Sequence, residues 1–236
     1  MLTLLNIGNT HAQPAIWHDG YLELLPRIPT SELTWERLPQ EYPVAAASVV
    51  PKASARLAGH GIYFLSAYDC GGLIDFSRVD PTTLGADRVA NAIAAAEFYP
   101  LPALVVDCGT AITSEIVDER RRFLGGAIAP GRRLMRRALF EGTAQLPEIP
   151  FSQELPEEPG RNTVEAIRFG VDRGAVGLVR ELVAASLRSC GIVSCLAAGG
   201  DAGFFAAALP ELKAVESDFT LHGIRLAWER RRDRQA

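Results

Sequence analysis

Leu5-Asn6-Ile7-Gly8-Asn9-Thr10 and Val106-Asp107-Cys108-Gly109-Thr110-Ala111 are two copies of one short pattern. Asn6 and Asp107 are 101 positions apart (107 − 6). Each copy follows an apolar run and leads into a second one, which predicts a strand, a tight turn and a return strand. A glycine turn lets backbone N–H groups approach an anion closely. One such turn is common, but two copies facing each other could hold a nucleotide between them.

The two turns offer similar phosphate donors but differ in charge. The candidate phosphate-binding residues are Gly8, Asn9, Thr10, Gly109 and Thr110. Asp107 can hold Mg²⁺, directly or through water, and so connect the metal to the phosphates. The first copy has the uncharged Asn6 at the matching position.

The composition is ordinary for a folded protein. The 236 residues are 48% hydrophobic and 22% charged, enough for one large or two small domains with a substantial core. The formal net charge of −4 argues against nucleic acid as the main partner. The four cysteines show neither a CxxC pair nor zinc spacing, which favours a reducing, cytoplasmic compartment. No apolar run is long enough to span a membrane, so no membrane partner is expected.

The order of expected elements predicts a duplicated α/β chain. Strands are expected at 2–7, 14–17, 21–25, 44–50, 62–65, 103–106, 112–117, 123–128 and 192–197. Helices are expected at 87–98, 131–140, 163–187 (as one helix or two), 202–209 and within 219–228. Strands begin each half and helices end it, so two related domains, 1–100 and 101–236, are expected with a cleft between them.

Two further patterns are candidates for chemistry. Gly199-Gly200-Asp201 follows an apolar run, and a diglycine there lets the backbone pack on a flat ligand such as adenine or ribose; an ordinary strand-to-helix turn is the alternative. In Gly85-Ala86-Asp87-Arg88, Asp87 could take the proton of a substrate hydroxyl and Arg88 could bind a carboxylate. The alternative is an acidic residue that complements a helix N-terminus, beside a solvated arginine.

Residues 125–137 combine glycines with arginines. The glycine-rich run Gly125 to Gly131 implies close backbone contact with a ligand or a neighbouring element. The spacing of the arginines between Arg132 and Arg137 predicts a shared helix face. We interpret this face as solvated charge, with a polyanion patch as the alternative.

Taken in order, the motifs resemble those of the type III pantothenate kinases, also called the Bvg accessory factor family, in the acetate kinase–hexokinase–actin superfamily. The matching segments cover nearly the whole chain: Asn6 to Thr10, Ser48 to Pro51, Leu84 to Asn91, Val106 to Thr113, Gly125 to Gly131, Gly142 to Pro147, Asn162-Thr163, Gly199 to Ala202 and Leu221 to Ile224. The resemblance implies two actin-like, ribonuclease H-like domains with an interdomain nucleotide cleft. It also implies ATP-dependent phosphorylation of pantothenate, the first step of coenzyme A biosynthesis.

The resemblance further implies a homodimer that uses ATP, Mg²⁺ and a monovalent cation, K⁺ or NH₄⁺. Asp87 would be the general base, and Arg88, with help from Gly85, would bind the pantothenate carboxylate. Thr163 would reach the substrate, from the other subunit. The ATP and metal residues would be Asn6, Gly8, Asn9, Thr10, Asp107, Gly109, Thr110, Gly199 and Gly200, with Asp118 as a further candidate for a cation site.

One departure from the family pattern motivates an alternative. The family has an aspartate where this chain has Asn6, and an amide lacks the charge that favours metal or ATP binding. The alternative is therefore a catalytically weak member with a regulatory or binding role. A third interpretation keeps the fold but takes another hydroxy acid as acceptor, and a fourth is DNA binding through the arginine face.

Overall fold

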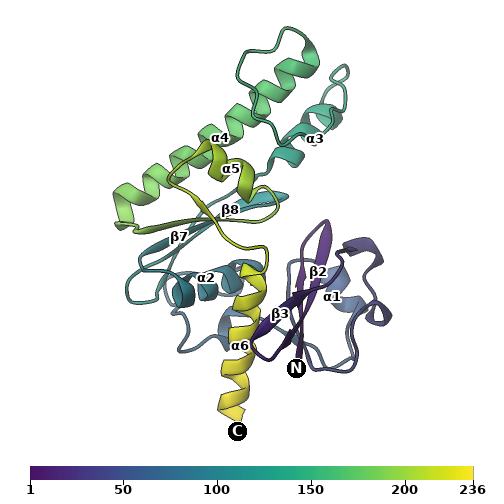
Figure 1. The fold of residues 1–236 in the computed structure, drawn as a ribbon, viewed down its shortest axis with the longest axis vertical. Helices are drawn as coiled ribbons and strands as arrows, with labels where there is room; N and C mark the ends of the chain where they lie inside the picture. The colour runs from purple at the N-terminus through teal and green to yellow at the C-terminus, as the bar shows by residue number, and fades with distance from the viewer. Residues whose placement is uncertain (236) are drawn as a thin grey trace. The chain divides into compact units, whose positions relative to one another are not determined.

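The computed structural model describes residues 1–235, which form two compact units (Figure 1). The first unit contains Met1–Leu101, Val117–Leu124 and the chain from Asp218 onward. The second contains Pro102–Ile116 and Gly125–Ser217. These units differ from the expected division at residue 100 because Val117–Leu124 and the chain from Asp218 onward belong to the first unit. The duplicated domains 1–100 and 101–236 stay a prediction.

The first unit is built on one mixed sheet. Its strands are β1 (Leu2–Ile7), β2 (His11–His18), β3 (Tyr21–Leu24), β4 (Ile28–Pro29), β5 (Val44–Ser48) and β6 (Tyr63–Phe64). Its helices are η1 (Thr30–Glu32), η2 (Trp35–Arg37), α1 (Pro51–Arg56), η3 (Ala67–Asp69), α2 (Ala86–Phe98) and α6 (Phe219–Gln235). The strand order is β3-β2-β1-β5-β6, with β4 paired to β2. β1 is antiparallel to β2 and parallel to β5.

The second unit repeats this plan. Its sheet is formed by β7 (Ala103–Cys108), β8 (Ala111–Val117), β9 (Phe123–Gly125), β10 (Ile128–Pro130), β11 (Ser194–Ala198) and β12 (Lys213–Ala214). Its helices are α3 (Arg132–Gly142), α4 (Thr163–Cys190) and α5 (Ala202–Ala208). The order β10-β8-β7-β11-β12 places a return strand on one side of β7 and the parallel β11 on the other. β7 therefore holds the position in its sheet that β1 holds in the first.

Successive side chains of a central strand point to opposite faces of its sheet, and this explains which residues enter each hydrophobic core. In β1, Leu2 and Leu4 pack toward α2 and α6, and Leu5 and Ile7 pack on the opposite face. Asn6 shares the face of Leu2 and Leu4 because side chains two apart point the same way. In β7, the residues 104, 106 and 108 face the core formed with α4 and α5.

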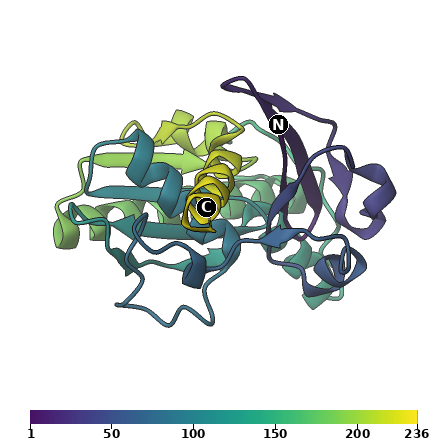
Figure 2. The same cartoon turned by 90° about the horizontal axis from the view of Figure 1, so that it is seen from below.

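A close helix crossing attaches α6 to the first unit. Figures 1 and 2 show α2 and α6 side by side. A Cβ on Gly223 would overlap the carbonyl group of Ala90, so this crossing needs a glycine. Thr220 Oγ1 also donates to Asn91 Oδ1 over 2.8 Å. Contacts between residues more than 120 positions apart therefore place the last helix with the first unit.

Local differences from the expected elements are few. α4 is one continuous helix through Gly174 and Gly177, and β12 was not expected. The expected strand at 123–128 is two short strands, β9 and β10. No helix among residues 1–235 is long and apolar enough to cross a membrane.

Candidate active site

The first predicted turn connects β1 to β2 at the carboxyl end of β1. Gly8 N donates to His11 O over 3.1 Å, which closes the turn. Asn9 and Thr10 are exposed at its tip, as a ligand-binding turn requires. Asn6 is partly buried in β1, with Gln13 on β2 and Ala47 on β5 as its register partners.

A buried threonine holds this turn in place. Thr30 Oγ1 donates to Gly8 O over 2.7 Å, and Thr30 N donates to Thr10 O over 3.0 Å. The Arg56 guanidinium donates to the carbonyls of Thr30 and Leu33, and so braces the threonine from behind. Thr30 lies 20 residues beyond the turn, and its role could not be predicted because no local sequence pattern connects the two segments.

Asp87 lies in the first turn of α2, beside the same edge of the sheet. Its Oδ1 accepts from Arg88 N over 2.8 Å, and a Cβ on Gly85 would lie 2.7 Å from that oxygen and 3.5 Å from Val49 Cγ1. Val49 N in turn donates to Ile7 O over 3.2 Å. This chain of contacts brings Asp87 to the end of β1 where the first turn begins.

The Asp87 carboxyl group has an unusual environment. Burial raises its pKa above the ordinary value, although the Arg88 amide and charge act in the opposite direction. A raised pKa is what a carboxylate needs to accept a proton near neutral pH. Gly85 leaves room for this carboxylate, which explains why a residue without a side chain is needed at position 85.

Arg88 points toward an aromatic cluster of the first unit. Its guanidinium carbon lies 5.7 Å from the centroid of the Phe123 ring, which is 5.4 Å from that of Phe76. Arg88 is partly exposed, so its charge is accessible to an anionic group. Its predicted contact with a carboxylate stays a prediction.

The second predicted turn connects β7 to β8 and is more crowded. Gly109 N donates to Ala111 O over 3.0 Å, and Gly131 N donates to Thr110 O over 2.9 Å. A Cβ on Gly131 would lie 2.6 Å from Thr110 O, so the glycine-rich run packs directly on the turn. The close contact expected of this run is therefore made with a neighbouring element.

Asp107 and the diglycine lie together beside this turn. Gly199 has φ +85°, and a Cβ there would overlap Asp107 Oδ1 and lie 2.7 Å from Cys108 O. Gly200 has open space where its Cβ would be. Asp201 N donates to Cys108 O over 3.0 Å. The second unit therefore gathers Asp107, Gly109 and the diglycine at one edge, as the paired register of β7 and β11 requires.

The donor set at this edge fits a phosphate-bound Mg²⁺ rather than a metal held by protein alone. Asp107 supplies hard oxygen ligands, the type that Mg²⁺ prefers. Among the side chains that the structure describes, no group of three or more His, Cys, Asp or Glu could hold a metal ion. Mg²⁺ usually binds through one or two carboxylates together with substrate phosphates, so one aspartate beside a phosphate turn is a sufficient protein contribution.

Thr163 is the first residue of α4 and is exposed. Asn162 caps the helix by accepting from Glu165 N over 3.0 Å. Thr163 lines an apolar groove of about 800 Å³ between α3 and α4, which Leu134, Met135 and Ile167 also line. The threonine is thus presented at the rim of an apolar surface of the second unit.

Asp118 belongs to the first unit, where a tight turn uses its oxygens. Oδ1 accepts from the amides of Arg120 and Arg122, both over 2.9 Å, and Oδ2 accepts from the Arg122 side chain over 2.7 Å. Desolvation acts to raise the pKa of Asp118, but the hydrogen bonds from Arg122 and from the two amides outweigh it and hold the pKa below its usual value. Its predicted role at a cation site stays a prediction.

The expected arginine face of α3 is only partly solvated. Arg133 and Arg137 are exposed, whereas Arg132 and Arg136 are buried and paired with Asp172. The interpretation of the whole face as solvated charge was therefore wrong. The aspartate partner is on α4, where the spacing of α3 gives no sign of it.

Comparisons with known proteins agree with this arrangement. The family model of the type III pantothenate kinases matches residues 2–185. A protein named type III pantothenate kinase from Akkermansia muciniphila is 36% identical, over 96% of this chain and 98% of the relative. Another of that name, from Thermomicrobium roseum, is 34% identical, over 98% of this chain and 97% of the relative.

Solved structures support the fold. A Baf family protein from Campylobacter jejuni aligns with a TM-score of 0.65 at 19% identity, over 98% of this chain and 99% of the other. A ROK family protein from Streptococcus pneumoniae aligns with a TM-score of 0.52 at 14% identity, over 100% of this chain and 99% of the other. The predicted fold class, α/β with two repeated mixed-sheet units, is confirmed, and the chain has the same fold as these solved structures.

Proposed function

We propose roles for these residues from one premise: the chain belongs to the type III pantothenate kinase family and catalyses ATP-dependent phosphorylation of pantothenate to 4′-phosphopantothenate, the first step of coenzyme A biosynthesis. The observation that carries the assignment of roles is the partly buried Asp87 carboxyl group beside the end of β1, whose pKa is raised by desolvation. No comparison favours the regulatory alternative.

Asp87 is the general base of this proposal. The primary hydroxyl oxygen of pantothenate attacks the γ-phosphorus of ATP, and its proton passes to the Asp87 carboxylate. The bond from the γ-phosphorus to the bridging oxygen breaks, and ADP leaves. The pKa raised by burial supports this role, because it makes the carboxylate a better proton acceptor near neutral pH.

The two glycine turns bind the phosphates. Gly8, Asn9 and Thr10 act in the first unit and Gly109 and Thr110 in the second, with backbone amides and hydroxyls as donors. Asp107 holds Mg²⁺, which when bound neutralises charge on the phosphates. Asn6 occupies the corresponding position of β1 without a charge, and Thr30 positions the first turn through its bonds to Gly8 and Thr10.

The adenosine lies against the diglycine. The open space beside Gly200 supports this role, since nothing lies within 4 Å of a Cβ placed there. Gly199 has a different role in this proposal: it makes room for the Asp107 carboxylate. The two neighbouring glycines are therefore needed for different reasons.

Pantothenate is held by its carboxylate and near its hydroxyl. Arg88, one residue after the base, binds the carboxylate, and Gly85 leaves the space that the Asp87 carboxylate occupies. Thr163 contributes from a second copy of the chain. The exposed position of Thr163 at the start of α4 is compatible with such a contact.

A homodimer is proposed through the α3–α4 face. The groove there is lined mainly by apolar side chains, and the large apolar residues Leu134 and Val164 are 40% and 41% exposed. Thr163 at its rim would connect dimer formation to the substrate site. Analytical ultracentrifugation tests this: a Leu134→Glu variant should be monomeric, and a monomeric wild type at micromolar concentration would contradict the proposal.

A monovalent cation, K⁺ or NH₄⁺, and a cytoplasmic location complete the proposal. Activity measured in K⁺, NH₄⁺ and Na⁺ salts at equal ionic strength identifies the cation, and equal rates in all three would rule it out. The location follows from the need for ATP, and cell fractionation tests it.

The decisive experiment is formation of 4′-phosphopantothenate from ATP and pantothenate by the purified protein. Wild type should turn over and Asp87→Asn should not, while the exposed Asp19→Asn serves as a matched control. Full activity in Asp87→Asn would refute the assigned base. Activity on another hydroxy acid but not on pantothenate would refute the acceptor.

A further inference from the structure

A fully buried arginine connects four segments of the second unit. Arg132, the first residue of α3, is 0% exposed. Its Nε donates to Asp172 Oδ1 on α4 over 3.0 Å and its guanidinium donates to Ser152 O over 2.6 Å. A longer bond of 3.4 Å reaches Asp201 Oδ2, just before α5. Burying a charge requires such partners, because an unpaired one would be strongly disfavoured.

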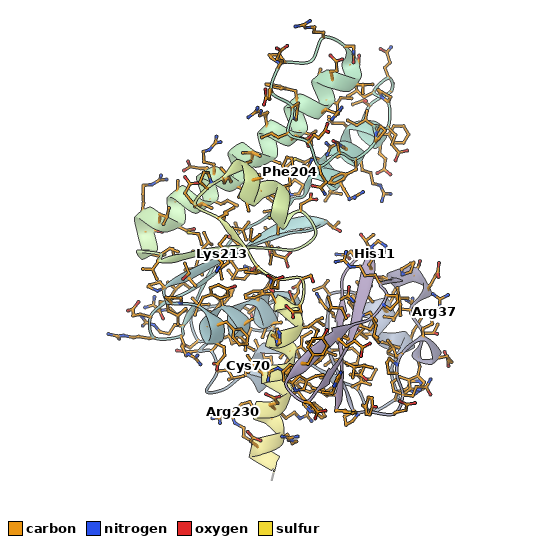
Figure 3. All side chains as sticks on the ribbon, viewed as in Figure 1. His11, Arg37, Cys70, Phe204, Lys213 and Arg230 are labelled. Carbon is orange, nitrogen blue, oxygen red and sulfur yellow. The ribbon has the colours of Figure 1, made fainter. Side chains whose placement is uncertain are left out.

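Aromatic rings and a second arginine complete the cluster. The Arg132 guanidinium carbon lies 3.4 Å from the ring centroid of Phe204 on α5, which Figure 3 labels, and 4.6 Å from that of Phe151. Arg136 Nη2 donates to both carboxylate oxygens of Asp172, over 2.6 and 2.8 Å. Two buried arginines therefore face two aspartates, and the cluster is formally neutral.

The cluster is bonded to the second phosphate turn in two ways. Gly131, directly before Arg132, donates from its amide to Thr110 O over 2.9 Å. On the other side, Asp201 accepts from Arg132 through its carboxylate and donates from its amide to Cys108 O over 3.0 Å. Arg132 thus closes a ring of contacts around residues 108–110 and the diglycine turn.

We propose that Arg132 is a positioning residue that fixes the Gly199–Asp201 turn against the 108–110 turn, and so sets the affinity for the nucleotide. The inference rests on the proposed function, since it takes these turns as the ATP side of the site. Arg132 does not touch the ligand. It acts through Asp201, whose amide holds the carbonyl of Cys108.

The test compares ATP binding with pantothenate use. Arg132→Met keeps the apolar stem of the side chain but removes the guanidinium group and its hydrogen bonds. It should weaken ATP binding by about 10–100-fold, as loss of a supporting partner does at other sites. The KM for pantothenate should stay within about three-fold, because that site lies on other residues. The Kd for ATP is measured by calorimetry, so the result does not depend on turnover.

Two further variants make the outcome decisive. Asp201→Asn keeps the shape of the aspartate and should give a smaller rise in the same Kd, so it remains informative if Arg132→Met does not fold. Arg133→Met is the matched control: Arg133 is the next residue, is exposed and stacks on Phe151, and its change should leave the Kd for ATP as in wild type.

The inference is overturned if Arg132→Met and Asp201→Asn lower the melting temperature while the Kd for ATP of the folded protein stays within about two-fold of wild type. Arg132 would then be structural only. A wild type that binds ATP without phosphorylating pantothenate would instead refute the proposed function and leave the inference testable by the same Kd.

Discussion

Gly199→Ala should damage the second unit, because Gly199 has two separate reasons to lack a side chain. Its φ of +85° lies in the left-handed region, where another residue costs roughly 1–2 kcal/mol. Its Cβ would also overlap Asp107 Oδ1 and lie 2.7 Å from Cys108 O. Moving packed groups aside costs about 1–3 kcal/mol more.

The two costs together should lower the free energy of unfolding by about 2–5 kcal/mol. For a chain of this size, each kcal/mol lowers the melting temperature by about 2–4 °C, so a loss of about 4–20 °C is expected in thermal unfolding followed by circular dichroism. Because the overlap is with the carboxylate assigned to Mg²⁺, the apparent Kd for Mg²⁺ in the kinase assay should rise as well.

Gly200→Ala provides the matched control one residue further along. Its Cβ would enter open space, and its backbone is not in the left-handed region, so the melting temperature should not change. If adenosine packs there, only the KM for ATP should rise. Equal melting temperatures for Gly199→Ala and wild type would refute the packing argument, and equal losses in both variants would show that the turn tolerates no side chain for some other reason.

Three further changes test the first unit. Burial raises the pKa of Asp87, so the protonated carboxyl group stabilises the fold fully below about pH 3.9, and this stabilisation is lost as pH rises through the raised pKa. Asp87→Asn should therefore unfold at a higher temperature than wild type at pH 8, and the difference should close toward pH 4. A variant that melts below wild type at pH 8 would contradict this. Thr30→Val leaves the Gly8 carbonyl without its 2.7 Å donor, so the free energy of unfolding should fall by about 1–3 kcal/mol in chemical denaturation and the KM for ATP should rise. Thr30→Ser keeps the hydroxyl and should behave as wild type. An equal loss of stability in both variants would assign the effect to the methyl group instead. Asn6→Asp restores a charge at the end of β1 and should lower the KM for Mg-ATP several-fold in steady-state kinetics; an unchanged value would show that Asn6 does not limit nucleotide binding.

The duplicated strand–turn–strand pattern was predictable because it depends on neighbours in the chain. Strand alternation and a turn glycine act over a few residues, and both copies occur in the structure at the centre of sheets with the same order. The helix that begins beside Asp87 was predictable for the same reason, from an alanine-rich run that ends before Pro100.

Features that depend on distant partners could not be predicted. Arg132 lies 40 residues from Asp172 and 69 from Asp201, so its local spacing resembled a solvated face although it is buried. Thr30 supports the first turn across 22 residues from Gly8, and α6 joins the first unit through Gly223. Periodicity shows that a residue lies on a given helix face, but not which element covers that face.

The sequence therefore determines which turns this protein has and which chemical groups those turns present: Asp107 with Gly109, Gly8 with Thr10, and the diglycine. These follow from backbone freedom and side-chain type, which are properties of single residues. The fold determines which groups hold the turns in position and how a carboxylate is desolvated, as for Thr30 and Asp87. Burial and long-range hydrogen bonds exist only once distant segments have packed together, since the cost of burying a polar group is recovered only when its partner is present.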